Sequence, residues 1–169
     1  DFQTFLKMRM PRTIKAQISQ RQLSSVAELQ NPKLIDALAY WKSKCGDNGM
    51  PSRSEIDPIE MRPFLNRIIL VDVEKDPQRY IFRLIGTLIT STTGRDVTGQ
   101  YLDEVYTESQ YNLLTVSLDH VVETRKPCRT TGSASFVDKD FVAVEALDLP
   151  LSTDGTDVNV ILRVISFNV

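Results

Sequence analysis

The sequence has 169 residues, of which 41% are hydrophobic, and this length fits one globular domain with a short extension rather than two full domains. Its 20 basic and 22 acidic side chains leave a formal net charge of −2, which excludes the global positive field that holds nucleic acid. No stretch approaches the roughly 20 apolar residues of a membrane-spanning helix, and the N-terminus lacks the continuous apolar core of a signal peptide.

The two cysteines, Cys45 and Cys128, are far apart in the chain and have neither a CxxC motif nor a neighbouring histidine. This pattern favours free thiols in a reducing compartment over a disulfide or a metal site, so we expect a cytoplasmic protein. The chain begins at Asp1 and not at methionine, and we expect that a segment before it has been removed.

Residues 1–30 are predicted to form an N-terminal helical extension of the domain that residues 31–169 make. Its sparse apolar residues and Pro11 predict an irregular start, and residues 14–29 then predict an amphipathic helix that needs a partner surface. Two uses of this helix are equally favoured. It forms the interface of a homodimer or of a partner complex, or it caps its own domain.

An asparagine N-cap followed by proline predicts a helix over residues 32–44, with Leu34, Leu38 and Trp41 on the face that packs against the sheet. A polar loop follows. A second cap and proline then predict a short helix from Asp57, which a later proline curtails or bends.

The remaining pattern predicts five strands, at residues 67–74, 80–85, 128–136, 140–151 and 157–169. Short helices and one long helix, residues 108–125, separate the second strand from the third. The turns between the last three strands are too short for parallel crossovers, so the predicted fold is α+β with one five-stranded antiparallel sheet. The internal helices should cover one face of this sheet and the N-terminal helices the other.

Several short motifs follow one another between residues 34 and 167. They are Tyr40-Trp41, Met50-Pro51-Ser52-Arg53, Ile56-Asp57-Pro58, the stretch from Tyr80 to Thr87, Gly94-Arg95-Asp96 with Thr98-Gly99, and Leu149-Pro150-Leu151-Ser152 with Asp154-Gly155. In this order they resemble the PAS domain family, in particular the small free-standing bacterial members common in alphaproteobacteria. The resemblance implies a cavity between the sheet and the helices of residues 87–125. It implies no particular ligand, because similar PAS domains bind haem, flavin, small acids or nothing visible.

Two charged residues, Arg83 and Glu145, interrupt strands that are otherwise apolar. An unpaired buried charge costs several kcal/mol, so each side chain must be paired or must bind something if it points into the cavity. The favoured interpretation is an internal ion pair of Arg83 with Asp96 or Glu145. The functional alternative is that Arg83 anchors an anionic or polar small ligand. The candidate ligand-binding residues are therefore Tyr80, Phe82, Arg83, Asp96, His120 and Glu145.

His120 is the only histidine, and it lies on the helix from which haem-binding PAS domains supply their iron ligand. It has no second ligand and no surrounding motif, so a surface or satisfied core histidine is favoured over a haem ligand. Photoactive flavin PAS domains carry a reactive cysteine after the second strand, where residues 89–92 here read Ile-Thr-Ser-Thr. This argues against covalent flavin chemistry, and no cofactor or metal is assigned.

The sequence thus predicts a sensory or interaction module that has no catalytic output. We expect a homodimer formed through the N-terminal helix that binds a small ligand or a signalling partner protein. No Walker loop, dinucleotide motif or hydrolase triad is present. Two alternatives stay open: a small α+β cone-type enzyme with acid–base residues in the cavity, and an adaptor with a filled core. A cavity that holds more than a water or two would exclude the adaptor.

Overall fold

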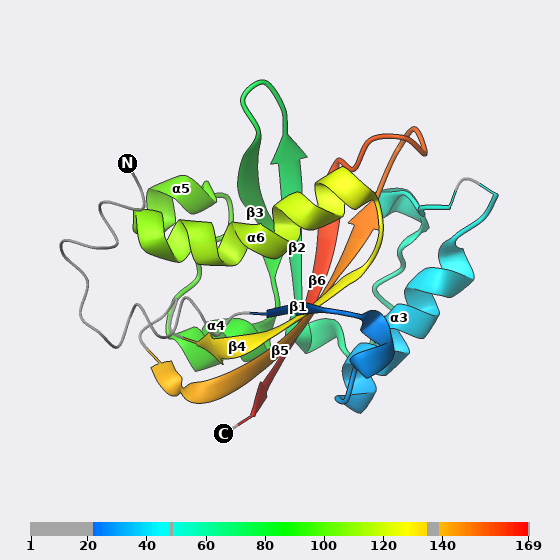
Figure 1. The fold of residues 1–169 in the computed structure, drawn as a ribbon. Coiled ribbons are helices and arrows are strands. Elements are labelled where there is room, and N and C mark those ends of the chain that lie inside the picture. The colour runs from blue at the N-terminus through cyan, green and yellow to red at the C-terminus, as the bar shows by residue number, and fades with distance from the viewer. Residues whose placement is uncertain (1–21, 48, 135–138, 169) are drawn as a thin grey trace.

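The computed structural model describes residues 22–47, 49–134 and 139–168, and it contains one antiparallel sheet in the order β1-β4-β5-β6-β2-β3 (Figure 1). The strands are β1 (Gln22–Ser24), β2 (Ile68–Glu74), β3 (Arg79–Ile85), β4 (Cys128–Ala134), β5 (Lys139–Leu151) and β6 (Val160–Asn168). The predicted α+β fold with its five antiparallel strands is confirmed. The number of strands is a correction, because β1 adds a sixth at the edge of the sheet.

The described part of the N-terminal segment is not the expected helix. Residues 22–24 pair with β4, and a 3₁₀ turn, η1 (Val26–Glu28), follows them. Three residues are too few to show an alternating pattern, so the sequence does not distinguish β1 from part of an amphipathic helix. The helix predicted over residues 14–29 is therefore wrong from residue 22 onward, and its earlier part lies outside the described residues. The division at residue 30 stays a prediction.

Helices cover both faces of the sheet. They are α3 (Pro32–Lys44), α4 (Thr87–Thr93), α5 (Leu102–Val105) and α6 (Glu108–Thr124), with short 3₁₀ turns η2 (Arg53–Glu55) and η3 (Leu65–Arg67). In Figure 1, α5 and α6 lie on one side of the twisted sheet, and α3 lies apart from them on the right. We call the face under α6 the inner face and the face under α3 the outer face. The bounds of α3 and α6 agree with the predicted helices, whereas the segment after Asp57 forms turns that lead into η3.

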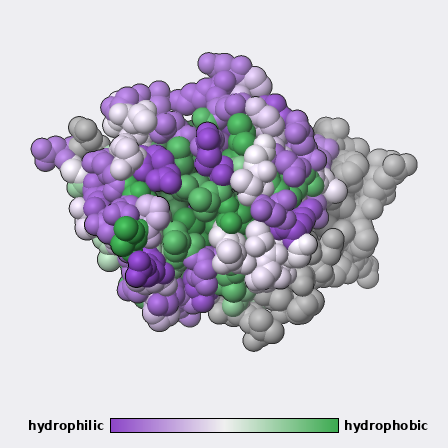
Figure 2. Space-filling model, turned by 180° about the vertical axis from the view of Figure 1, so that it is seen from behind, coloured by the Kyte–Doolittle hydropathy of each residue, from purple (hydrophilic) through white to green (hydrophobic). Residues whose placement is uncertain are grey.

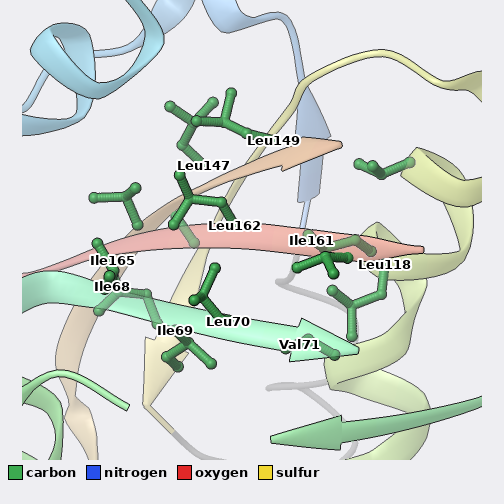
Figure 3. Packing of buried hydrophobic residues seen from close by; sticks show 14 of the residues in the cluster. Ile68, Ile69, Leu70, Val71, Leu118, Leu147, Leu149, Ile161, Leu162 and Ile165 are labelled. Atoms are coloured by element: carbon green, nitrogen blue, oxygen red, sulfur yellow. The ribbon is translucent and has the colours of Figure 1, made fainter. Parts of the chain in front are cut away.

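The core consists of an apolar layer on each face of the central strands. Figure 3 shows side chains of β2, β5 and β6 on both sides of their ribbons, with Leu118 of α6 beside Ile161. Strands buried on both faces are apolar at nearly every position, which explains the continuous runs in β2 and β6. On the outer face, Trp41 of α3 fixes the helix to the sheet by donating from Nε1 to the carbonyl oxygen of Pro150 at 2.8 Å.

Gly86 lies between β3 and α4, where the backbone passes close to the backbone of Asn66 and Ile68. Its amide donates to the carbonyl oxygen of Ile68 at 2.7 Å, and a Cβ placed on Gly86 would lie 2.4 Å from the carbonyl oxygen of Asn66. Backbone atoms cannot yield as a flexible side chain can, so this position requires glycine for space.

We expect Gly86→Ala to lower the free energy of unfolding by roughly 2 kcal/mol or more, because the backbone around Asn66 must shift to admit the methyl group. Gly46→Ala is the matched control, since a Cβ there meets no atom within 4 Å. Urea denaturation of both variants checks this expectation. Equal stabilities of the two variants would contradict it.

Candidate functional site

Two small cavities lie between the inner face of the sheet and the helices above it. Their volumes are about 20 and 30 Å³, and each has room for about one water molecule. They have four wall residues in common: Ile69, Phe82, Tyr106 and Ile165. Arg163 adds a charged group to the wall of the first cavity, and Arg95 does so for the second. We call the two cavities together the inner chamber.

An aromatic pair lies in the wall that the two cavities share. The rings of Phe82 and Tyr106 meet edge to face, with centroids 6.2 Å apart and an interplanar angle of 73°. The guanidinium carbon of Arg95 lies 5.0 Å from the centroid of the Tyr106 ring, within the range of a cation–π contact. Burial raises the pKa of the Tyr106 hydroxyl, and the positive charges of Arg95 and Arg163 oppose that rise.

The charged wall of the first cavity is a buried ion pair. Arg163 is 4% exposed and Asp148 is fully buried. Nε and Nη2 of Arg163 donate to the two carboxylate oxygens of Asp148 at 2.6 and 2.8 Å, and Nη2 also donates to Ser117 Oγ at 2.7 Å. Burial alone would lower the pKa of Arg163, but Asp148 raises it, so the guanidinium stays charged. The pair thereby joins β5 and β6 to α6.

A second polar contact joins the sheet to α6 through Tyr80. This side chain is 1% exposed, donates its hydroxyl to the carboxylate of Asp119 on α6, and accepts a hydrogen bond from Gln78 Nε2 at 2.8 Å. Burial, followed by the hydrogen bond to Asp119, raises the pKa of Tyr80. The hydroxyl therefore stays protonated and acts as a donor.

The alternation of β3 separates the candidate residues of that strand. Tyr80 and Phe82 lie on the inner face, whereas Arg83 is 67% exposed and donates from Nε to Asp72 on β2 at 2.7 Å. The predicted pairing of Arg83 with Asp96 or Glu145 is therefore wrong. A neighbouring strand supplies the partner, and alternation along one strand does not reveal which residue of the next strand stands opposite.

Asp96 does not reach the inner chamber or Arg83. It is exposed in the loop after α4, where its carboxylate accepts hydrogen bonds from the amide and the hydroxyl of Thr98 at 3.0 and 2.6 Å. These bonds lower the pKa of Asp96 and close the loop. The side chain of Asp96 thus stabilises the loop that carries it.

Glu145 is paired, as expected for a buried charge, but with Arg129. The carboxylate accepts from Arg129 Nε at 2.8 Å and from the amides of Gln30 and Asn31 at 3.1 and 2.8 Å. Arg129 Nη1 also donates to Ser24 Oγ at 2.8 Å. This buried pair on the outer face fastens β1 and the start of α3 to the sheet, away from the inner chamber.

His120 is exposed on α6 and is not among the residues that line either cavity. The residues of the inner chamber do not fit a haem, because no histidine lines it and each cavity holds about one water molecule. Within the described ranges no group of three or more histidine, cysteine or acidic side chains could hold a metal ion.

Asp148 and Arg163 are not among the candidate residues predicted from the sequence, although both carry the signal that identifies Arg83 and Glu145. Asp148 interrupts the apolar run Ala-Leu-Asp-Leu-Pro, and Arg163 interrupts Ile-Leu-Arg-Val-Ile. The same argument about buried charge would predict that they pair. Tyr106 and Arg95 carry no such signal, because they lie in loops whose path the pattern does not determine.

An open groove of about 720 Å³ lies on the outer face beside the hairpin of β2 and β3. Its lining is Arg53, Leu70, Asp72, Val73, Glu74, Ile81, Arg83, Leu84, Asn159 and Val160. Figure 2 shows the molecule from behind, where hydrophobic side chains gather in a hollow with hydrophilic side chains around it. The ion pair of Arg83 and Asp72 is thus part of this groove and not of the inner chamber.

Comparison with known proteins gives one family. The family model described as PAS domain matches residues 29–166, which is most of the chain. A search of curated proteins gives no match. Within the described residues, each helix is too short or too polar to cross a membrane.

We expect Tyr80→Phe to cost about 2 kcal/mol of unfolding free energy, because it removes a buried hydroxyl that donates to a carboxylate. Tyr101→Phe is the control, since its hydroxyl donates to Glu74 at the exposed surface at 3.0 Å and should cost less than about 1 kcal/mol. Thermal and urea unfolding measure both losses. A loss of unfolding free energy for Tyr80→Phe that is no larger than the loss for Tyr101→Phe would contradict a stabilising contact between Tyr80 and Asp119.

The pair of Glu145 and Arg129 should make stability depend on pH. Burial raises the pKa of Glu145, but the hydrogen bonds from Asn31 and Arg129 outweigh it, so the folded-state pKa is lowered. A lowered carboxyl pKa adds stability above the unfolded value of about 4.3 and loses it as the pH falls through the folded value. Glu145→Gln should therefore cost about 3 kcal/mol near pH 7, and its deficit should shrink below roughly pH 4.

Urea titrations of the wild type and Glu145→Gln between pH 3 and pH 7 measure this deficit. Glu28→Gln is the control, because Glu28 is exposed and lies 3.7 Å from the same arginine, so it should cost less than about 1 kcal/mol. A deficit of Glu145→Gln that is the same at every pH would show that the charge of Glu145 is not what stabilises the fold.

Proposed function

The chain belongs to the PAS domain family, and from that premise we propose that it is a sensory module of signal transduction that binds a small ligand in the inner chamber. It has no catalytic step of its own. The response to the ligand is a change in the helices that cover the chamber, and a partner protein reads this change.

The Phe82–Tyr106 pair is the observation that carries this proposal. The pair stands between two cavities, and Tyr106 comes from the segment that joins α5 to α6. A ligand that moves the Tyr106 ring therefore acts directly on the start of α6. A ligand shifts the equilibrium between two conformations only if it binds one of them more tightly than the other. The position of the Tyr106 ring would decide which conformation binds the ligand more tightly.

The chemistry of the chamber supports a role without catalysis. The carboxylate of Asp148 accepts one hydrogen bond from Arg163 on each of its oxygens, and Asp148 is not among the residues that line either cavity. Burial raises the pKa of Tyr106 above its ordinary value, so its hydroxyl is a poor acid near neutral pH. A cone-type enzyme needs an acid and a base that converge on the substrate, and this pair of groups does not supply them.

A cytoplasmic homodimer is part of the proposal, with the N-terminal segment as its interface. Cys45 and Cys128 are both free thiols, which supports a reducing compartment. Residues 1–21 of the interface segment lie outside the described chain.

The second candidate function is that of an adaptor that binds a partner while its core stays filled. The size of the two inner cavities favours it, since each holds about one water molecule, whereas the groove on the outer face is open and measures about 720 Å³. In this case Arg83, with Asp72, contacts the partner at the rim of the groove.

Native mass spectrometry of the freshly purified chain separates the two candidates. A sensor should show a mass above that of the bare chain that is lost on denaturation, and the same spectrum gives the oligomeric state. The bare-chain mass, together with no thermal stabilisation by any compound of a metabolite library, would contradict the sensor and favour the adaptor. A mass equal to one chain would contradict the homodimer.

A further inference from the structure

We propose that the inner chamber binds an aromatic carboxylate, whose ring takes the place of the Tyr106 ring and whose carboxylate lies between Arg163 and Arg95. This inference rests on the proposed sensor function, because it names the ligand class of the same chamber.

The contacts of the Tyr106 ring define the shape of the ligand. This ring meets the Phe82 ring edge to face and lies under the guanidinium of Arg95. A flat aromatic ring in the same place keeps the edge-to-face contact and the cation–π contact, whereas an aliphatic chain keeps neither. The two cavities have Ile69, Phe82 and Ile165 in common besides Tyr106, so withdrawal of the Tyr106 ring joins them into one larger space.

The charges of the chamber define the polar end of the ligand. Asp148 neutralises Arg163, but all four hydrogen bonds of this guanidinium to described residues come from Nε and Nη2. Nη1 therefore has donor capacity left on a side chain that is 4% exposed and lines the first cavity. Arg95 is an exposed residue that lines the second cavity and has no ion pair with any described residue, so it adds a positive charge at the solvent-accessible edge of the chamber.

A carboxylate satisfies both arginines, because its two oxygens accept from guanidinium N–H groups in one plane. A cationic ring is disfavoured, because Arg95 repels it and Arg163 offers it no acceptor. A neutral ring without an acceptor fills the space but gains no charge-assisted hydrogen bond from Nη1 of Arg163, so it should bind more weakly than a carboxylate. The chemistry thus favours an anion on a ring over either a cation or a neutral ring.

Benzoate is the probe for this proposal, and isothermal titration calorimetry with the full chain measures its binding. Benzyl alcohol, benzylamine and cyclohexanecarboxylate are matched in size and differ in charge or aromaticity. We expect benzoate to bind at least about tenfold more tightly than benzyl alcohol, since the loss of one charge-assisted hydrogen bond has that effect on affinity. Cyclohexanecarboxylate should bind more weakly than benzoate, and benzylamine should not bind.

Two variants locate the site. Tyr106→Ala vacates the space of the ring, so benzoate should bind it about tenfold more tightly than the wild type, whereas Tyr106→Phe keeps the ring and should not gain affinity. Arg95→Gln should weaken benzoate at least about fivefold and leave benzyl alcohol unchanged. Arg53→Gln, in the outer groove, is its control and should leave benzoate unchanged. Circular dichroism confirms that each variant is folded.

The possible results have distinct meanings. Equal affinity of Tyr106→Ala for benzoate and benzyl alcohol overturns the carboxylate class while the chamber remains a ligand site. A loss in Arg53→Gln as large as in Arg95→Gln overturns the location. Absence of benzoate binding to both the wild type and Tyr106→Ala overturns the inference as a whole. The proposed sensor function is judged separately, because a ligand of another class retained in native mass spectrometry supports it in each of these cases.

Discussion

The buried ion pair of Asp148 and Arg163 is the interaction on which the inner half of the molecule depends. The two residues stand directly opposite each other on β5 and β6, and a slip of β6 by one residue would move Arg163 to the other face, away from Asp148. Burying two charges is costly unless they are paired and hydrogen-bonded, so their contacts with Ser117 and the carbonyl oxygen of Leu114 fix where α6 lies. One pair thus sets both the strand register and the height of the helix above the inner chamber.

The outer face also has a buried ion pair, formed by Glu145 and Arg129. Glu145 and Asp148 lie three positions apart on β5, which places them on opposite faces of the strand. The outer pair holds β1 and the start of α3, and the inner pair holds α6. Both layers are therefore anchored to one strand, and β5 has neighbours on both sides that keep its backbone hydrogen bonds complete. Further contacts attach each layer to other strands, since Tyr80 of β3 holds α6 and Asn31 Nδ2 donates to Ser166 Oγ of β6 at 2.8 Å.

The sequence is sufficient to predict the elements whose periodicity extends over many residues. The limits of α3 and α6 and the five long strands follow from local patterns. Partners across strands do not follow, because alternation gives the face of a residue and not its neighbour. Arg83 shows this, since Asp72 reaches it next to a register shift between Leu70 and Val71.

The positions of residues in loops are the second feature that the sequence pattern does not predict. Tyr106 and Arg95 reach the chamber because the segments that carry them fold back over the sheet, and no local pattern encodes that path. Charged residues in apolar strands are a signal that can be read, but only if it is applied to every strand. Applied to β6 and to the end of β5, it identifies the ion pair that lines the chamber.

The strengths of these contacts determine which part of the molecule responds to a ligand. Side-chain hydrogen bonds to charged groups contribute about 1.5 to 3 kcal/mol each, and two such contacts, those of Tyr80 and Arg163, hold α6 to the sheet. The strands are held by backbone ladders, interrupted at register shifts in the β2–β3 and β4–β5 pairs, and these ladders cannot be released one bond at a time without exposing buried polar groups. In the proposed sensor, displacement of Tyr106 at the start of α6 would therefore shift the helix and leave the sheet in place. In that proposal, the exposed side of α6, which carries Val116 and His120, is the surface that a partner protein would contact.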